Sequence, residues 1–225
     1  MTGRVTRVAP DRFFEAIARR YDRVYAPDAQ TTRARMERVL GELPPASRVL
    51  DLGVGTGREL GALQEAGHAP VGLDLSPSMI AICARRARPV PLVTADLWGP
   101  LPFDAGAFDA AIALHGTLAH PTHDGACAAL ASEVARVLRP GGVFVAEVPA
   151  PSLLAYLDAA GSIDAGDLQM RREGDVVVHE DRAAGVAVDA RVLDADAWRA
   201  LFTRDFDVTV EALGELELLV VGRRR

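Results

Sequence analysis

The stretch that decides the fold is Val49-Leu50-Asp51-Leu52-Gly53-Val54-Gly55-Thr56-Gly57-Arg58-Glu59. It reads as an apolar strand ending in an acid, then a loop with a glycine at every second position, then the start of a helix. Glycine has no Cβ, so such a loop lets a bound molecule approach the main chain closely. The first amides of the following helix lack partners within it, and the helix dipole adds positive potential there. The pattern therefore predicts a strand–loop–helix unit that binds a cofactor.

The spacing of these glycines separates two classes of cofactor. The dinucleotide fingerprint is G-x-G-x-x-G, whose third glycine allows close packing of helix on strand. Arg58 stands where that third glycine should be, and the glycines run G-x-G-x-G after Asp51-Leu52. This run resembles motif I of the class I S-adenosylmethionine-dependent methyltransferases, whose pattern is close to E/D-x-G-x-G-x-G. The cofactor contacts implied by this motif are Asp51, Gly53, Val54, Gly55, Thr56 and Gly57.

Two further acids support the resemblance. Residues 70–76 read as a strand that ends at Asp74, with Ser76 as the N-cap of the next helix. The tip of this strand lies beside the first glycine loop in a βαβ unit, so Asp74 can accept hydrogen bonds from both ribose hydroxyls. The family places an acid at the position of Asp96 against the adenine amino group. Capping by Asp74 and a solvated loop acid at Asp96 are the alternatives.

The resemblance also extends the cofactor site to other elements. Two N-terminal aromatic residues are expected to close over the cofactor, with core packing as the alternative. The remaining cofactor contacts it implies are Tyr21, Tyr25, Leu75, Met79, Ala95, Leu97, Leu114 and His115.

The order of the predicted elements indicates an α/β fold. Strands and helices alternate from residue 49 to residue 147, which predicts a parallel sheet covered on both faces. A helix over 195–202 and a hairpin of 206–213 with 217–222 follow. The resemblance implies a Rossmann-like, doubly wound, mostly parallel seven-stranded sheet with an antiparallel C-terminal hairpin. Its strand order is 3-2-1-4-5-7-6.

We predict a single domain over residues 1–225, in four parts. These are N-terminal helices in 1–43, the cofactor-binding core in 47–148, an insertion in 149–192, and the C-terminal helix and hairpin in 193–225. The insertion, with strands expected at 175–179 and 186–192, is longer than a connection needs. The resemblance implies that it caps the active site and selects the acceptor. A dimer contact or cover for the sheet edge is the alternative.

Three histidines follow the fourth predicted strand: His115, His120 and His123. Ligands bind at the carboxyl ends of parallel strands, and histidine can remove a proton near neutral pH. We expect His120 to act as a base on the acceptor and His115 to touch the methionyl part of the cofactor. His115 and Glu147, at the tip of the fifth strand, are the other catalytic candidates. Solvated loop histidines are the alternative.

Composition excludes several classes of protein. All 25 basic residues are arginine, so mechanisms that need lysine, such as Schiff-base chemistry, are excluded. A net charge of −6 disfavours a nucleic-acid partner. No apolar run is long enough for a bilayer, and no Cys/His cluster has zinc spacing, so we predict no membrane partner and no metal. Cys83 and Cys127 are expected to be free thiols, which favours the cytoplasm.

The main hypothesis is an S-adenosylmethionine-dependent methyltransferase. It would transfer the methyl group by in-line displacement to a small-molecule acceptor and release S-adenosylhomocysteine, as a monomer or homodimer. Three alternatives remain: a protein side chain as acceptor, a non-catalytic module that binds the cofactor, and an NAD(P)-dependent reductase. Arg58 and the terminal hairpin disfavour the reductase.

Overall fold

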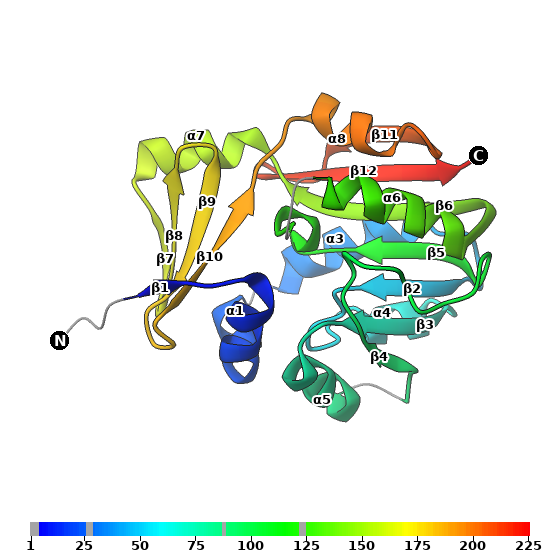
Figure 1. Ribbon diagram of the computed structural model, residues 1–225, viewed down its shortest axis with the longest axis horizontal. Coiled ribbons are helices and arrows are strands. Elements are labelled where there is room, and N and C mark those ends of the chain that lie inside the picture. Colours follow the sequence, from blue (N-terminus) through cyan, green and yellow to red (C-terminus); the bar gives the residue numbers. More distant parts are fainter. Residues whose placement is uncertain (1–4, 26–28, 87–88, 122–124) are drawn as a thin grey trace.

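The computed structural model describes residues 5–25, 29–86, 89–121 and 125–225. Over these residues the chain forms a seven-stranded and a five-stranded sheet, which lie side by side (Figure 1). The larger sheet runs in the spatial order β11 (Phe206–Ala212), β12 (Glu217–Arg224), β6 (Leu138–Pro149), β5 (Phe108–Ala113), β2 (Arg48–Leu52), β3 (Ala69–Asp74) and β4 (Leu92–Thr94). Strands β2 to β6 are parallel, whereas β12 is antiparallel to both of its neighbours. Counted from β2 along the chain, this is the predicted order 3-2-1-4-5-7-6.

Helices cover both faces of this sheet, because its strands are apolar on both sides. Alternate residues of β6 point to opposite faces of the sheet and pack in different hydrophobic clusters. Phe144 packs with α6 (Ala126–Val137) and α8 (Ala195–Phe202). Val145 packs with α3 (Ala29–Glu42), α4 (Leu60–Glu65) and α5 (Pro77–Arg86). No helix of the described ranges is both long and apolar enough to span a membrane.

Side-chain caps fix where two of these helices begin. The Ser76 hydroxyl accepts a hydrogen bond from the Met79 amide at 3.1 Å, so α5 begins at Pro77 as predicted. The Asp194 carboxylate accepts from the Ala197 amide at 2.8 Å at the start of α8. Both caps direct the chain from a loop back onto the sheet.

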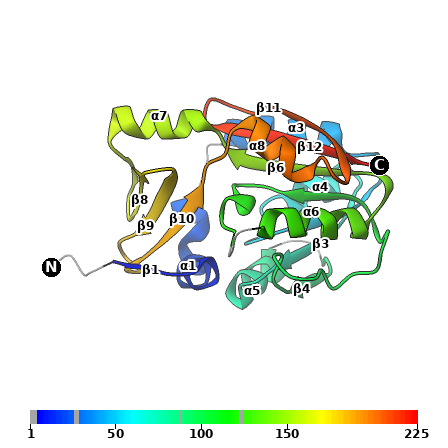
Figure 2. The same cartoon turned by 45° about the horizontal axis from the view of Figure 1, so that its top comes forward.

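The smaller sheet is more extensive than the sequence predicted. Instead of two strands, the insertion contains α7 (Pro151–Ala160), β7 (Ile163–Ala165), β8 (Leu168–Glu173), β9 (Val176–Asp181) and β10 (Val186–Arg191). The N-terminal β1 (Thr6–Arg7) joins the sheet parallel to β10. Figure 2 shows α7 above this sheet. The missed strands β7 and β8 are short and carry many polar residues, so their hydrophobic pattern is weak. Each forms an antiparallel hairpin with the next strand along the chain.

Helical structure lies within residues 1–43, as predicted. Ahead of α3 it consists of α1 (Pro10–Ile17), a 3-10 turn (Ala18–Arg20) and α2 (Tyr21–Val24). Glu15 on α1 accepts hydrogen bonds from the hydroxyls of Ser76 and Ser78 at the start of α5.

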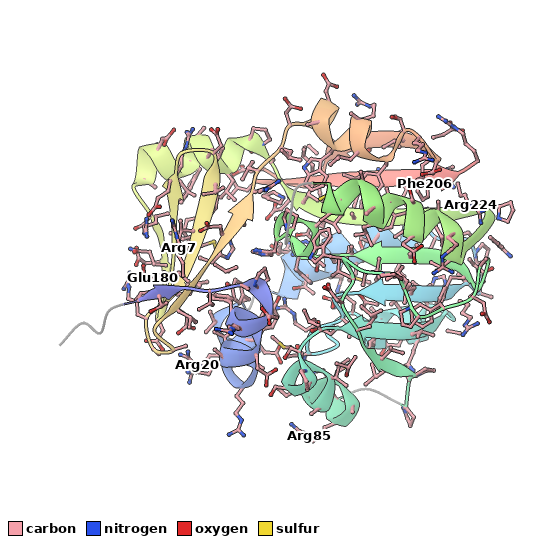
Figure 3. The ribbon with its side chains drawn as sticks, viewed as in Figure 1. Arg7, Arg20, Arg85, Glu180, Phe206 and Arg224 are labelled. Atoms are coloured by element: carbon pink, nitrogen blue, oxygen red, sulfur yellow. The ribbon has the colours of Figure 1, made fainter. Side chains whose placement is uncertain are left out.

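Arg20, labelled in Figure 3, ties the same segment to the smaller sheet. Its guanidinium donates to the buried Asp181 of β9 at 2.6 Å. The N-terminal helices therefore join the two sheets.

Candidate active site

The glycine loop after β2 is fixed by backbone conformation and by packing. Gly53, Gly55 and Gly57 have φ values of 74°, 53° and 77°, in the left-handed region that favours glycine. A Cβ on Gly53 would lie 2.7 Å from Thr117 Cγ2, and one on Gly57 would lie 2.5 Å from Cys83 Sγ. The nearest atom to a Cβ on Gly55 is 3.9 Å away. Gly53 and Gly57 thus allow close packing, while Gly55 leaves open space.

Asp74, at the end of β3, lies against this loop. Its Oδ2 accepts a hydrogen bond from the Gly55 amide at 2.8 Å, and its Oδ1 accepts from the Ser76 amide at 2.9 Å. Each carboxylate oxygen keeps acceptor capacity beyond that one bond. Burial raises the pKa of Asp74 above its usual value, although the backbone amides oppose this effect. An ionised Asp74 therefore gains from further donors, such as ribose hydroxyls.

Asp51 and Asp96 differ in their surroundings. Asp51 is buried in β2, and its Oδ2 has no hydrogen-bond partner among the described residues. Burial, with the charges of Glu59 and Asp74, raises the pKa of Asp51 well above its usual value. Asp96 Oδ1 accepts a hydrogen bond from the Trp98 amide at 2.9 Å, which fixes the loop after β4.

A cavity of about 340 Å³, here called the cofactor cavity, lies over these residues. Its charged lining residues are acids, and no arginine of the described chain lines it. This lining suits a cofactor with a positive charge, hydroxyls and a flat ring, and it lacks the cations that a pyrophosphate attracts. The residues that line it are Pro10, Asp11, Phe14, Tyr21, Gly53, Gly55, Asp74, Leu75, Ser76, Met79, Asp96, Leu97, Trp98, His115, Thr117 and His120.

The structure brings most of the predicted cofactor residues to this cavity. Tyr25 lines the neighbouring cavity instead. Six others lie outside the lining: Asp51, Val54, Thr56, Gly57, Ala95 and Leu114. Thr56, for example, donates to Asp22 of α2 at 2.6 Å and so holds the N-terminal segment on the loop. The sequence missed Asp11 and Phe14, because their helical pattern indicated only that one face of the helix is buried.

A second cavity, of about 360 Å³, adjoins the first. The two share the four lining residues Phe14, Tyr21, His115 and His120. The insertion supplies an apolar wall to the second cavity, which consists of Leu153, Ile163, Ala165, Leu168, Met170, Val177 and Ala190. The insertion therefore covers a space next to the cofactor cavity.

Paired charges form the polar end of the second cavity. Arg35 Nε lies 3.2 Å from Oε2 of the buried Glu147, and Arg35 Nη2 lies 3.5 Å from Glu217 Oε1. Burial raises the pKa of Glu217, although the charge of Arg35 opposes this. Neither Arg35 nor Glu217 was singled out in the sequence, because each lies in an ordinary amphipathic pattern.

His115 is held by partners on both ring nitrogens. Its Nε2 lies 2.5 Å from Glu59 Oε1, and its Nδ1 lies 3.4 Å from Arg35 Nη1. Burial acts to raise the pKa of Glu59, but the hydrogen bond and charge of His115 outweigh it and lower that pKa. With φ of 55°, the His115 backbone adopts the left-handed conformation. These contacts orient the ring, which lines both cavities.

His120 is the freer of the two described loop histidines. The ring is buried, and its Nδ1 lies 2.9 Å from the carbonyl oxygen of Asp189. Burial lowers the pKa of His120, so the imidazole is neutral near pH 7. Because a carbonyl only accepts, Nδ1 carries the hydrogen and Nε2 keeps a lone pair. His123 lies outside the described residues.

Comparison with known proteins gives the family. A methyltransferase domain model matches residues 49–142. Demethylmenaquinone methyltransferase of Thermus thermophilus is 35% identical over 155 residues, which cover 64% of this chain and 67% of that protein. The enzyme of the same name from Corynebacterium kroppenstedtii is 36% identical over 134 residues, 58% of this chain and 56% of that protein. The 18S rRNA (guanine(1575)-N(7))-methyltransferase of Saccharomyces cerevisiae is 41% identical over 93 residues, 41% and 33% of the two chains. The chain thus spans about half or less of the length of the last two relatives.

Solved structures share the fold over nearly the whole chain. A protein from Pyrococcus horikoshii OT3 has a TM-score of 0.72 at 23% identity, with 92% of this chain and 97% of that one covered. The sugar N-methyltransferase KedS8 of Streptoalloteichus has a TM-score of 0.67 at 24% identity, with 91% of each chain covered. The fold and the glycine loop are those of a Rossmann-like domain that binds a nucleotide cofactor. The chain belongs to the class I S-adenosylmethionine-dependent methyltransferases, which confirms the predicted family and cofactor class.

Proposed function

We propose that this protein transfers the methyl group of S-adenosylmethionine to a small molecule bound in the second cavity. The observation that carries the proposal is the junction of the two cavities at four shared residues. A methyl group on a cofactor bound over the glycine loop would face the space that the insertion covers. Residues 149–192 thus act as an acceptor cap within one domain.

The residues of this chain would hold the cofactor and orient it. Asp74 accepts from the ribose, Asp96 accepts from the adenine amino group, and the glycine loop leaves room for the main body of the molecule. When bound, S-adenosylmethionine supplies an electrophilic methyl group on a sulfonium ion. Holding nucleophile and methyl carbon in line can lower the barrier by about 7–11 kcal/mol in favourable cases.

The histidines have different proposed roles. His120 accepts a proton from the acceptor, because its Nε2 keeps a lone pair next to both cavities. His115, with both nitrogens engaged, contacts the cofactor. Glu147 fixes Arg35 at the polar end of the second cavity.

Size and charge favour a small acceptor over a polymer. The second cavity is lined largely by apolar side chains, and its Arg35 is paired with Glu147 and Glu217. The names of the relatives above refer to demethylmenaquinone, an rRNA guanine and, for one solved structure, a sugar, so they do not select one acceptor. A net charge of −6 disfavours the RNA among them.

Two measurements test the proposal. Calorimetric titration with S-adenosylhomocysteine should show binding, whereas NADH and NADPH should give none. Methyl-labelled S-adenosylmethionine is then incubated with separated small-molecule, RNA and protein fractions, and label should enter the small molecules. Label in RNA or protein would overturn the small-molecule acceptor. Cofactor binding without any transfer would favour a non-catalytic module.

A further inference from the structure

Five aromatic side chains form a closed circuit of ring contacts where the two cavities join. The ring centroids are 6.3 Å apart for Phe14–Tyr21, 5.0 Å for Tyr21–Tyr25, 6.1 Å for Tyr25–His179, 5.8 Å for His179–His120, and 5.3 Å for His120–Phe14. All five line the second cavity, and three of them also line the cofactor cavity. We call these residues the aromatic collar. A group that receives a methyl from the cofactor cavity must sit against it.

The collar contains two histidines, and the Nδ1 atom of one faces a hydrogen-bond acceptor whereas the Nδ1 atom of the other faces a donor. His120 Nδ1 faces the Asp189 carbonyl and therefore carries the hydrogen, which leaves Nε2 as an acceptor.

His179, on β9, has Tyr25 as its partner. Its Nδ1 lies 3.2 Å from the Tyr25 hydroxyl. That contact is the one hydrogen bond found for this hydroxyl within the described chain. A phenol O–H is a stronger donor than a neutral imidazole N–H, and an imidazole nitrogen is a stronger acceptor than a phenol oxygen. Tyr25 therefore donates to His179 Nδ1, and the His179 hydrogen is on Nε2.

Both Nε2 atoms are open to the cavity. Within the described part of the chain, neither has a hydrogen bond, and neither is among the buried side-chain atoms that lack a partner. An acceptor nitrogen and a donor nitrogen thus belong to rings that line the same cavity and pack edge to face, with centroids 5.8 Å apart.

We infer that His179 is a second acceptor-binding residue and that the methyl acceptor presents a hydroxyl group between His120 and His179. This inference rests on the proposed function. A hydroxyl has one hydrogen and two lone pairs. The hydrogen is donated to His120 Nε2, one lone pair accepts from His179 Nε2–H, and the other lone pair is free to attack.

Other nucleophiles match this pair of partners less well. A neutral amine has a single lone pair, which it needs for the attack and so does not offer to His179. A carboxylate has no hydrogen for His120, and it would bury a charge beside an apolar wall. Two arginines among the described residues line the cavity. Arg35 is paired with Glu147 and Glu217. Arg58 donates to the Tyr25 carbonyl oxygen at 2.6 Å and lies over the Tyr21 ring.

The proposed transfer needs no reactant besides the acceptor, the cofactor and these side chains. The hydroxyl oxygen attacks the methyl carbon, a C–O bond forms, and the C–S bond breaks with its electron pair passing to sulfur. The hydroxyl proton moves to His120 Nε2 and is lost to water after the ether product leaves. His179 holds the oxygen in line, and Tyr25 is a positioning residue that keeps the donor hydrogen of His179 on Nε2.

Nitrogen NMR of the full chain, bound to S-adenosylhomocysteine, tests the tautomers without an acceptor. At pH 7 we expect His120 to be protonated on Nδ1 and His179 on Nε2. Tyr25→Phe should turn the His179 signal into a mixture of tautomers while His120 stays unchanged. A protonated, charged ring at either position, or the opposite tautomer at His179, overturns the inference.

Binding of matched probes tests the hydroxyl preference. We would titrate 2-naphthol, 2-naphthylamine, 2-naphthoate and 2-methoxynaphthalene into the same complex. The naphthol should bind about tenfold more tightly than each of the others, as expected for two made hydrogen bonds.

Two variants of one residue form the control. Glutamine carries an amide hydrogen near the place of Nε2, so His179→Gln should keep the preference for the naphthol. Asparagine places its amide near Nδ1, so His179→Asn should lose it. Equal affinity for all four probes, or the same result for both variants, overturns the inference. Failure of S-adenosylhomocysteine to bind at all would instead overturn the proposed function.

Discussion

Replacing Gly57 with alanine should destabilise the fold through two separable effects. The backbone at Gly57 has φ of 77°, and holding an alanine in this region costs about 1–2 kcal/mol. The new Cβ would also lie 2.5 Å from Cys83 Sγ on α5, inside contact distance. Such overpacking costs about 1–3 kcal/mol. Together we expect Gly57→Ala to lower the free energy of unfolding by about 2–5 kcal/mol.

Urea unfolding at constant slope measures this loss, and Gly55→Ala is the matched control. Gly55 has a similar positive φ, but its nearest neighbour to a Cβ is 3.9 Å away, so only the backbone cost should remain. Because Gly55 lines the cofactor cavity, this control should instead weaken binding of S-adenosylhomocysteine.

A double-mutant cycle isolates the packing effect. Cys83→Ala removes the sulfur that the new methyl would strike, so it should cost less in the Gly57→Ala background than in the wild type. The coupling free energy should be about 1–3 kcal/mol. Equal losses for the two glycine variants, or a coupling near zero, would refute the packing argument and leave only backbone strain.

Four further predictions concern single side chains. Asp74→Asn should weaken the binding of S-adenosylhomocysteine by about 1–3 kcal/mol, as measured by calorimetry. An unchanged affinity would mean that Asp74 does not bind the ribose. His120→Asn keeps a donor for the Asp189 carbonyl but lacks the free Nε2. This variant should slow turnover by about 10²-fold or more without changing cofactor affinity. Turnover equal to that of the wild type over the pH range would contradict the role of His120 as a base. The hydroxyls of Ser76 and Ser78 lower the pKa of Glu15, so their contribution to stability is present above its usual pKa and is lost as pH falls through the folded-state value. The stability difference between wild type and Glu15→Gln should therefore shrink in acid unfolding experiments, and a constant difference would argue against this capping contact. Burial, with the nearby His120, lowers the pKa of His179 to about 3, so from pH 6.5 downward the unfolded state binds a proton that the folded state does not. Between pH 6.5 and 5 the wild type should lose about 2 kcal/mol more stability than His179→Phe, and parallel pH profiles would mean that this ring titrates normally.

Short-range patterns in the sequence determined the cofactor half of this protein. The turn from β2 into the following helix needs glycine at positive φ, and Asp74 ends a strand one βα unit later. Such constraints act between residues close in the chain, so they are visible as spacing. The strand order was expected from the family resemblance that these motifs carry.

Only the tertiary structure decided the acceptor half. His179 lies on a strand of mixed polarity, and its neighbour His120 comes from a loop more than fifty residues earlier in the chain. The N-terminal β1 pairs with β10, which lies far along the chain, and local patterning does not record such a pairing. Strands β7 and β8 instead pair with the next strand in the sequence, and only their weak hydrophobic pattern hid them. The ring nitrogen that carries a hydrogen depends on the partner facing it: a carbonyl for His120 and a phenol for His179. The sequence shows where the histidines are, but only the long-range packing of the chain determines whether the free ring nitrogen of each accepts or donates.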